Sequence, residues 1–201
     1  MWNPDYHPEG CPPSSLITLN FDSTEKSKSP IELTWTDGGI RPPHPDIIPA
    51  DSDIGGPDSQ NGVLMIGEKG IISTNINDSS PLTPKLYLYD GQTEFGPETE
   101  DMPEPEYGHQ RKWVDACKAG FRSKEHLDLT SSFDYAGPMT ETVLMGNLAI
   151  RSYMLRNKKS NGSFDYYARK KLLWDGDNMK ITNIEEANQF VTREYREGWK
   201  I

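Results

Sequence analysis

Two groups of side chains in this 201-residue sequence have residue types and spacing suited to binding chemistry. The first group, Trp35, Asp37, Arg41 and His44, occupies a glycine- and proline-rich loop that follows a predicted strand. Loops held by a rigid scaffold carry a large share of binding residues, which makes this loop a candidate site. The same residues also have a structural interpretation, because aspartate forms turns and proline stiffens them.

The second group is His109 and Trp113, which are one helical turn apart in a predicted helix and therefore share a face. A histidine in such a position can donate a hydrogen bond or exchange a proton near neutral pH. The alternative is a histidine that packs against a tryptophan of the core. The sequence leaves both interpretations open.

Several classes of catalytic and cofactor site have no support in the sequence. It has no GxGxxG, GxxxxGK[ST], HExxH, CxxC or GxSxG motif, and its four histidines lack the spacing of metal ligands. The two cysteines, Cys11 and Cys117, are too few for a disulfide framework. We therefore predict no metal site, no cofactor site and no catalytic residue within this chain.

Charge and hydropathy narrow the class of partner. The formal net charge of -10 disfavours nucleic acid, since phosphate binding needs a positively charged surface. No apolar run reaches the ~18 residues of a membrane-spanning helix, and the N-terminal residues lack the pattern of a signal peptide. We expect no membrane span, and both the cytoplasm and the periplasm stay open as locations.

Strands and helices must position the candidate side chains. Alternating apolar residues predict a hairpin at 14–21 and 31–35, a second hairpin at 63–67 and 71–74, and a further strand at 85–89. A proline-rich surface loop is predicted at 40–51, and an acidic loop at 96–106.

Three helices are predicted after these strands. The first covers 108–119 and ends at Gly120; the second covers 131–156, with Gly137-Pro138 suited to its start and most of its surface buried; the third covers 184–190 and is capped by Asn183. Hairpins first and helices later favour a single α+β domain over residues 1–201, with residues 1–13 as a lead-in. Its mainly antiparallel open sheet would have helices packed on one face.

Four stretches resemble one known family in the order in which they occur. They are LTWTDGGIRPPHP (33–45), GHQRKWVDACKAG (108–120), SFDYAGPMTETVLMGNLAIR (132–151) and WDGDNMKITNIEEANQFVTREYREGW (174–199). Together they are similar to the C-terminal domain of the Gfo/Idh/MocA family of glucose-fructose oxidoreductases and inositol dehydrogenases, closest to a Bacteroidetes-type branch. The likeness covers about residues 14–199.

The resemblance implies a domain that shapes a sugar pocket and makes an oligomer interface, beside an N-terminal Rossmann domain that binds NAD or NADP. That Rossmann domain, the family's Glu-Lys-Pro motif and its catalytic histidine are not among these residues, so we expect a fragment that performs no hydride chemistry alone. The resemblance also implies a substrate contact for His109 and a closing role for Tyr195 and Arg196. The departures are His44, where the branch has arginine, and a longer segment at 155–171.

We therefore expect the substrate-binding and oligomerisation domain of an NAD(P)-dependent oxidoreductase that acts on a sugar or cyclitol. The expected substrate contacts are Trp35, Asp37, Arg41, His109, Tyr195 and Arg196. The expected oligomer is a homodimer through a sheet face, with apolar strand residues such as Leu33 and Met65 at the interface. Two alternatives stay open: a stand-alone carbohydrate-binding or scaffold module, and part of a relative that uses NAD to cleave glycosides.

Overall fold

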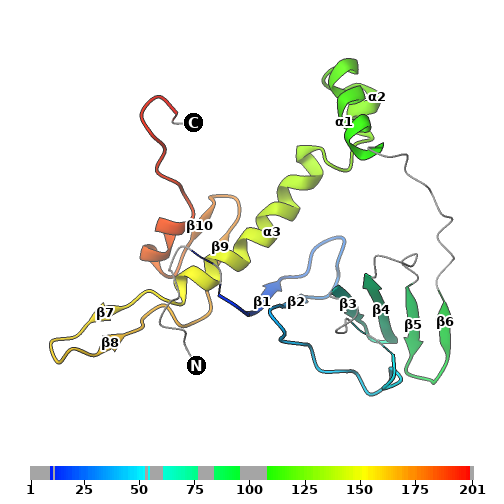
Figure 1. Ribbon diagram of the computed structural model, residues 1–201, viewed down its shortest axis with the longest axis horizontal. Helices are drawn as coiled ribbons and strands as arrows, with labels where there is room; N and C mark the ends of the chain where they lie inside the picture. The colour runs from blue at the N-terminus through cyan, green and yellow to red at the C-terminus, as the bar shows by residue number, and fades with distance from the viewer. Residues whose placement is uncertain are drawn as a thin grey trace. The chain divides into compact units, whose positions relative to one another are not determined.

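The computed structural model describes residues 10, 12–52, 54, 61–76, 84–95 and 108–199. The chain divides into two compact units (Figure 1): unit 1 is Met1–Ile40 with Leu127–Ile201, and unit 2 is Arg41–His126. Most of the predicted lead-in at 1–13 and the acidic loop at 96–106 lie outside the described residues. The expectation of a single domain stays a prediction, and each unit is described by itself.

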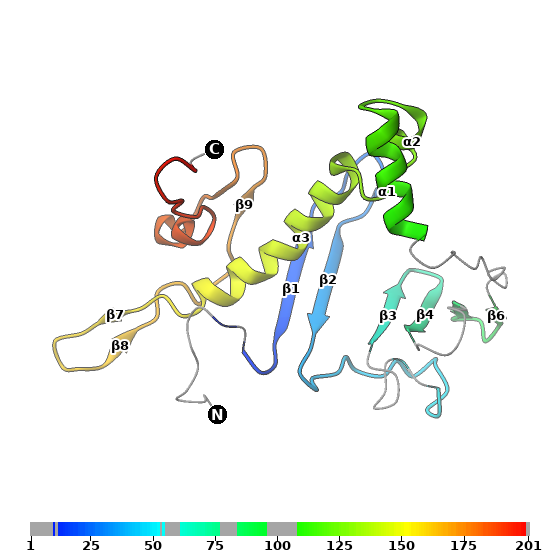
Figure 2. The same ribbon diagram turned by 45° about the horizontal axis from the view of Figure 1, so that its top comes forward.

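Unit 1 is built on an antiparallel hairpin and one long helix. Strands β1 (Leu16–Phe21) and β2 (Ile31–Thr36) pair so that Ile17 faces Trp35, which confirms the first predicted hairpin. Helix α3 (Phe133–Ser152) packs along β1, as Figure 2 shows. The close approach occurs at Gly146, where an added Cβ would lie 3.4 Å from the Cδ1 atom of Ile17.

The predicted start of this helix at Gly137-Pro138 is wrong. Helix α3 begins at Phe133, after an extended Ser132, and includes Pro138. The backbone oxygen of Pro138 accepts a hydrogen bond from the Thr142 hydroxyl at 3.0 Å. A proline so close to the start removes only one hydrogen bond of the ladder, so the first turn can form ahead of it. Asp134 lies inside that first turn, where the positive end of the helix dipole stabilises its negative charge.

The expectation that this helix is mostly buried is also wrong for the described structure. Only Gly146 and Ser152 are buried in α3, whereas Met139 and Val143 are 56% and 65% exposed. The physical reason is that the elements packed against the helix are too narrow to cover most of its surface. A two-stranded hairpin and the short helix η1 (Glu185–Phe190) pack against α3, and together they cover one narrow stripe.

The C-terminal part of unit 1 has its own small core. Two short hairpins follow α3, formed by β7 (Asn157–Lys158) with β8 (Phe164–Asp165) and by β9 (Trp174–Asp175) with β10 (Lys180–Ile181). The buried residues of this core are Ala168, Ile181, Ile184 and Ala187. The predicted short helix is present as the 3-10 helix η1.

Asparagine side chains connect the segments of this core. The predicted cap by Asn183 is wrong, because its Oδ1 accepts from the Leu173 N–H and its Nδ2 donates to the Lys171 oxygen. Asn188 brackets Ile181 in the same way, accepting from its N–H at 2.8 Å and donating to its oxygen at 2.9 Å. Each amide replaces a missing strand partner, so the backbone polar groups are satisfied.

Unit 2 contains a four-stranded antiparallel sheet in the order β3 (Asn61–Ile66), β4 (Gly70–Ile76), β5 (Lys85–Leu88), β6 (Thr93–Phe95). The second predicted hairpin and the following strand are confirmed, and β6 was not predicted. One face of the sheet packs through Ile71 and Tyr87 onto Ile48 of the proline-rich loop. The buried side chain of Ile48 anchors this loop, which has no regular secondary structure.

Two helices complete unit 2. Helix α1 (Gly108–Ala119) has the predicted bounds, and the predicted cap Gly120 has a φ of 95° and donates its N–H to the Ala116 oxygen. Helix α2 (Lys124–Leu127) was not predicted. The α+β class is thus confirmed, with antiparallel pairing throughout the described strands. These strands form one four-stranded and three two-stranded sheets.

Candidate functional site

Asp37 is the centre of a hydrogen-bonded cluster at the end of the first hairpin. Its Oδ1 accepts from the Ser15 N–H, and its Oδ2 accepts from the Ser15 hydroxyl at 2.9 Å. The backbone N–H of Asp37 donates in return to the Ser15 oxygen at 3.1 Å. These bonds close the hairpin where β1 begins and β2 ends, so the carboxylate has a structural task.

Trp35 is held by the same carboxylate. Its indole Nε1 donates to Asp37 Oδ2 at 3.1 Å, while 58% of the residue is exposed. Trp35 lies opposite Ile17 in the strand register and therefore on the side of the hairpin that faces α3. The ring is held at one edge by Asp37 and is exposed elsewhere.

These contacts set the pKa of Asp37. Partial desolvation would raise it, but the hydrogen bonds from Trp35 and Ser15 outweigh this effect and hold the pKa below the ordinary 3.8. A carboxylate with a lowered pKa in the folded state stabilises the fold above its ordinary pKa. That contribution is lost as the pH falls through the lower, folded-state value.

We therefore predict that Asp37→Asn lowers the free energy of unfolding by about 1 kcal/mol at pH 7, a modest figure because the group is largely exposed. The difference from the wild type should shrink as the pH falls below the ordinary pKa of 3.8, because the unfolded carboxyl then binds a proton that the folded carboxylate resists. Urea denaturation of both proteins between pH 3 and pH 7 measures this. A difference that stays constant over that interval would contradict the assigned cluster.

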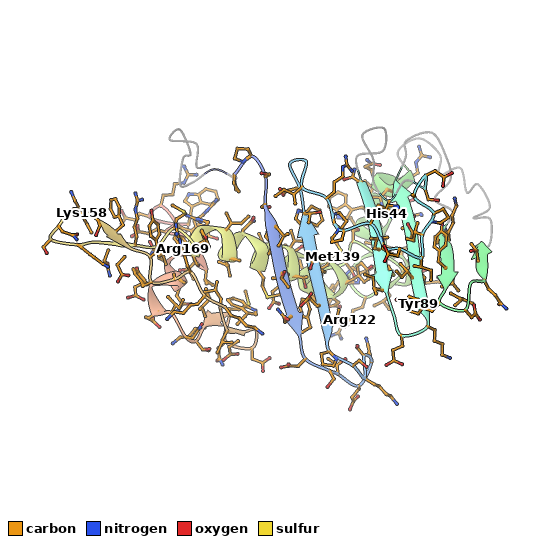
Figure 3. The ribbon with its side chains drawn as sticks, turned by 90° about the horizontal axis from the view of Figure 1, so that it is seen from below. His44, Tyr89, Arg122, Met139, Lys158 and Arg169 are labelled. Carbon is orange, nitrogen blue, oxygen red and sulfur yellow. The ribbon has the colours of Figure 1, made fainter. Side chains whose placement is uncertain are left out.

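Arg41 and His44 belong to unit 2. Arg41 is exposed, and its predicted substrate contact stays a prediction. The ring nitrogens of His44 lie 3.2 Å from the Pro45 and Ser52 oxygens, so this side chain is engaged by its own loop. The labelled His44 in Figure 3 lies on that loop, next to the strands of unit 2.

His109 is exposed in the first turn of α1, and Trp113 is 57% exposed one turn later. Of the two interpretations of this pair, the one with a core tryptophan is therefore wrong for the described structure. The exposed imidazole is free of a surrounding apolar shell, as a substrate contact requires. Its role as such a contact stays a prediction.

Tyr195 and Arg196 lie in the irregular C-terminal tail of unit 1. The guanidinium carbon of Arg196 is 4.7 Å from the centroid of the Trp199 ring, and the Arg196 oxygen accepts from the Trp199 N–H at 3.1 Å. The tail curls around an open hollow of about 760 Å³, lined by Glu194, Tyr195, Arg196, Glu197 and Gly198. Donors, acceptors and a phenol ring thus border one hollow.

Sequence reasoning missed two members of these clusters. Ser15 holds Asp37 across 22 positions in the chain, and no local pattern indicates such a partner. Trp199 supports Arg196 through a turn in which Gly198 has a φ of 81°. Gly198, two residues after Arg196, is a turn signal that could have indicated it.

The chain matches no protein-family model, and no curated protein sequence matches it. Among the residues that the structure describes, no three His, Cys, Asp or Glu side chains are grouped to hold a metal ion. In that same part of the chain, no helix has both the length and the apolar character needed to cross a membrane. The candidate site therefore rests on the geometry described above.

Proposed function

We propose that this chain is the substrate-binding and oligomerisation domain of an NAD(P)-dependent oxidoreductase of the Gfo/Idh/MocA type, acting on a sugar or cyclitol. The observation that carries the proposal is the fixed, exposed indole of Trp35. Its Nε1 is bound to Asp37, and Asp37 is bound to Ser15. Because the ring is immobilised before any ligand arrives, stacking on it costs little conformational entropy.

Sugars and cyclitols suit such a surface. Their C–H groups pack on an aromatic face, and their hydroxyl groups need several donors and acceptors around the edge. In this proposal they come from Tyr195, Arg196 and two carboxylates, which line the hollow of the tail. The planar fork of Arg196 can bind two neighbouring oxygen atoms at once, so we assign it to recognition of a vicinal diol.

The described residues do not fit the pyrophosphate of a dinucleotide. That group is held by a glycine-rich turn that leads into a helix N-terminus. Helix α3 instead has Asp134 in its first turn, whose negative charge repels a phosphate. Helix α1 is preceded in the sequence by Glu104, Glu106 and Tyr107 instead of glycines. In this proposal, NAD or NADP is bound by a Rossmann domain outside these residues, and no step of hydride transfer is assigned to this chain.

Substitution of Trp35 tests the proposed sugar surface. We predict that Trp35→Ala lowers the affinity for the preferred sugar or cyclitol about tenfold, the loss expected for one stacking contact. The matched control is Tyr89→Ala, since Tyr89 is 54% exposed in unit 2 and outside the candidate site. Calorimetry with a panel of neutral monosaccharides and inositols measures both variants.

Two results of this titration would contradict the proposal. One is equal loss of affinity in the Trp35 and Tyr89 variants, which would indicate non-specific contact with exposed rings. The other is micromolar affinity of the unmodified chain for NAD or NADP, which would place a cofactor site where we assign none.

The strand register limits which sheet face can form the oligomer interface in this proposal. On β1 and β2 the face opposite α3 carries mainly Thr18, Asn20, Glu32 and Thr34, so that hairpin has no second apolar face. The sheet of unit 2 does have one. Met65 pairs with Ile72 and Ile72 with Leu86, on the face opposite the one that packs on Ile48. Neither α1 nor α2 packs on this sheet.

We therefore predict a homodimer through the Val63, Met65, Ile72 and Leu86 face, of which Met65 is 60% exposed. Met65→Lys should give monomers, because a lysine at the centre of such an interface has no partner for its charge. Glu32→Lys, on the polar face of the first hairpin, is the control and should remain dimeric. Light scattering at high micromolar concentration gives the mass, and a monomeric wild-type chain would contradict this interface.

A further inference from the structure

The hairpin of β7 and β8 carries a stack of alternating arginine and aromatic side chains. The guanidinium carbon of Arg156 lies 4.0 Å from the centroid of Phe164 and 5.6 Å from that of Tyr166. The guanidinium carbon of Arg169 lies 3.5 Å from the centroid of Tyr166 and 4.6 Å from that of Tyr153. Both arginines thus contact the ring of Tyr166, and the two charges lie near one another.

This arrangement immobilises both guanidinium groups. Arg156 also donates from one terminal nitrogen to the Tyr166 hydroxyl at 2.9 Å, and Arg169 donates from Nε to the backbone oxygen of Tyr153 at 3.5 Å. Stacking occupies the flat faces of a guanidinium group, whereas its N–H donors point outward in the plane. Both arginines are exposed. Their remaining donors are therefore held in position for an anion at little entropic cost.

The charges of the hairpin are separated by face. Lys158 pairs with Phe164, and Asn157 pairs with Asp165. Since neighbours along a strand point to opposite sides, Asp165 lies on the face opposite Phe164 and Tyr166. Asp165 is the one carboxylate of residues 156–171, and it is thus directed away from the stacked rings. The face with the rings carries cations without that counter-charge.

The segment is strongly basic within an acidic chain. Residues 156–171 contain six lysines and arginines and one aspartate, whereas the whole chain has a net charge of -10. Figure 3 shows Lys158 toward the free end of the hairpin and Arg169 at its base. The hairpin projects from the C-terminal end of α3 within unit 1, as Figure 1 shows. A surface of this sign and position is accessible to an extended anionic ligand.

We propose that the hairpin binds an anionic carbohydrate chain that carries carboxylate or sulfate groups. A guanidinium fork binds either group with two parallel hydrogen bonds, and the exposed parts of Phe164 and Tyr153, 44% and 49% of each residue, provide ring surface for the sugar itself. The choice of a carbohydrate rests on the proposed function. Nucleic acid would meet the same net negative charge of the chain, so its binding is an outcome of the test below.

The test is calorimetry of the full chain with oligogalacturonate, heparin oligosaccharides, neutral dextran, polyglutamate and single-stranded DNA. We expect binding to at least one of the two anionic carbohydrates, and at least about tenfold weaker binding to the other three polymers. Oligogalacturonate and heparin separate carboxylate from sulfate as the recognised group. Affinity for polyglutamate or DNA equal to that for the carbohydrates would overturn the proposal, because it would indicate attraction between charges alone.

Two pairs of substitutions test the role of the stack. Arg156→Gln with Arg169→Gln should lower the affinity about tenfold. Arg156→Lys with Arg169→Lys keeps the charge and loses the fork, so it should also weaken binding several-fold. The matched control is Lys26→Gln with Lys28→Gln, which removes the same charge from the turn of the first hairpin and should leave the affinity unchanged. Unchanged binding in the Arg→Lys variant would overturn the proposal.

Binding of the anionic chain at the hairpin and binding of the neutral sugar at Trp35 are tested separately. The arginine variants should keep wild-type affinity for the neutral sugar or cyclitol, and Trp35→Ala should keep wild-type affinity for the anionic chain. Circular dichroism of each variant confirms that it is folded. Loss of both affinities in a folded arginine variant would contradict a separate surface on the hairpin.

Discussion

Gly38→Ala is expected to lower the free energy of unfolding by about 3 kcal/mol. Gly38 has a φ of 60°, and a Cβ atom at this position would collide with the Pro13 oxygen and the Ser14 Cα. These are backbone atoms, which cannot move aside as a flexible side chain can. The substitution should therefore displace the chain next to Ser15 and break the cluster that Asp37 forms with it.

Gly39→Ala provides the matched control for this prediction. Gly39 has a φ of 89°, and nothing lies within 4 Å of an added Cβ. Gly39→Ala should therefore lower the free energy of unfolding by only about 1 kcal/mol, the cost of the backbone strain of an alanine in the left-handed conformation. Urea denaturation of the two variants separates strain from collision. Equal destabilisation of the two would contradict the close approach of Gly38 to residues 13 and 14.

Ile181→Ala is expected to destabilise unit 1 by about 3 kcal/mol, a typical cost for removing a buried branched side chain. Ile181 is 1% exposed and lies in the core with Ala168, Ile184 and Ala187. Its backbone is fixed on both sides by Asn188, so the surroundings cannot collapse easily into the cavity. A rigid cavity of this kind gives the larger costs of such substitutions.

The control is Leu173→Ala, close to the same core but 50% exposed. It should cost less than about 1 kcal/mol, since surface substitutions away from special features have small effects. Thermal and urea denaturation monitored by tryptophan fluorescence gives both values, because Trp174 packs against this core. A cost for Ile181→Ala no larger than that for Leu173→Ala would contradict the assigned core.

Local patterns predicted those elements whose cause is local. The alternation in β1 and β2 and the helical spacing of apolar residues in α1 were sufficient to place these three elements, because a period of two or of 3.6 residues is a property of the local backbone. Gly120 ended α1 for the expected reason, a left-handed residue at the C-terminus. A left-handed residue at the end of a helix is usually glycine, so the sequence can predict this position.

Patterns failed where a distant partner decides the result. The apolar residues of α3 predicted burial on two sides, but the described hairpin covers one stripe centred on Gly146. Asn183 resembled a helix cap, yet it bonds to Leu173 and Lys171, ten and twelve positions away. Such partners depend on tertiary placement, which single-sequence periodicity does not contain.

The candidate site was also predicted only in part from the sequence. Trp35 and Asp37 were predicted as binding residues from their loop position, and the structure adds that each also stabilises the hairpin. In the stretch at 174–199, Asp175, Asn183 and Asn188 hold turns and backbone in place. Tyr195 and Arg196 in the same stretch border the open hollow of the tail.

The most direct test of the proposed function is a nuclear magnetic resonance titration of the isotope-labelled chain with neutral monosaccharides and inositols. We predict that at least one of them causes saturable shifts of the Trp35 indole and of the Asp37 and Arg196 amides. The hairpin at 156–171 should not respond to these uncharged ligands. The result that would contradict the account is the absence of saturable shifts at these residues for every sugar and inositol, up to the solubility limit of each.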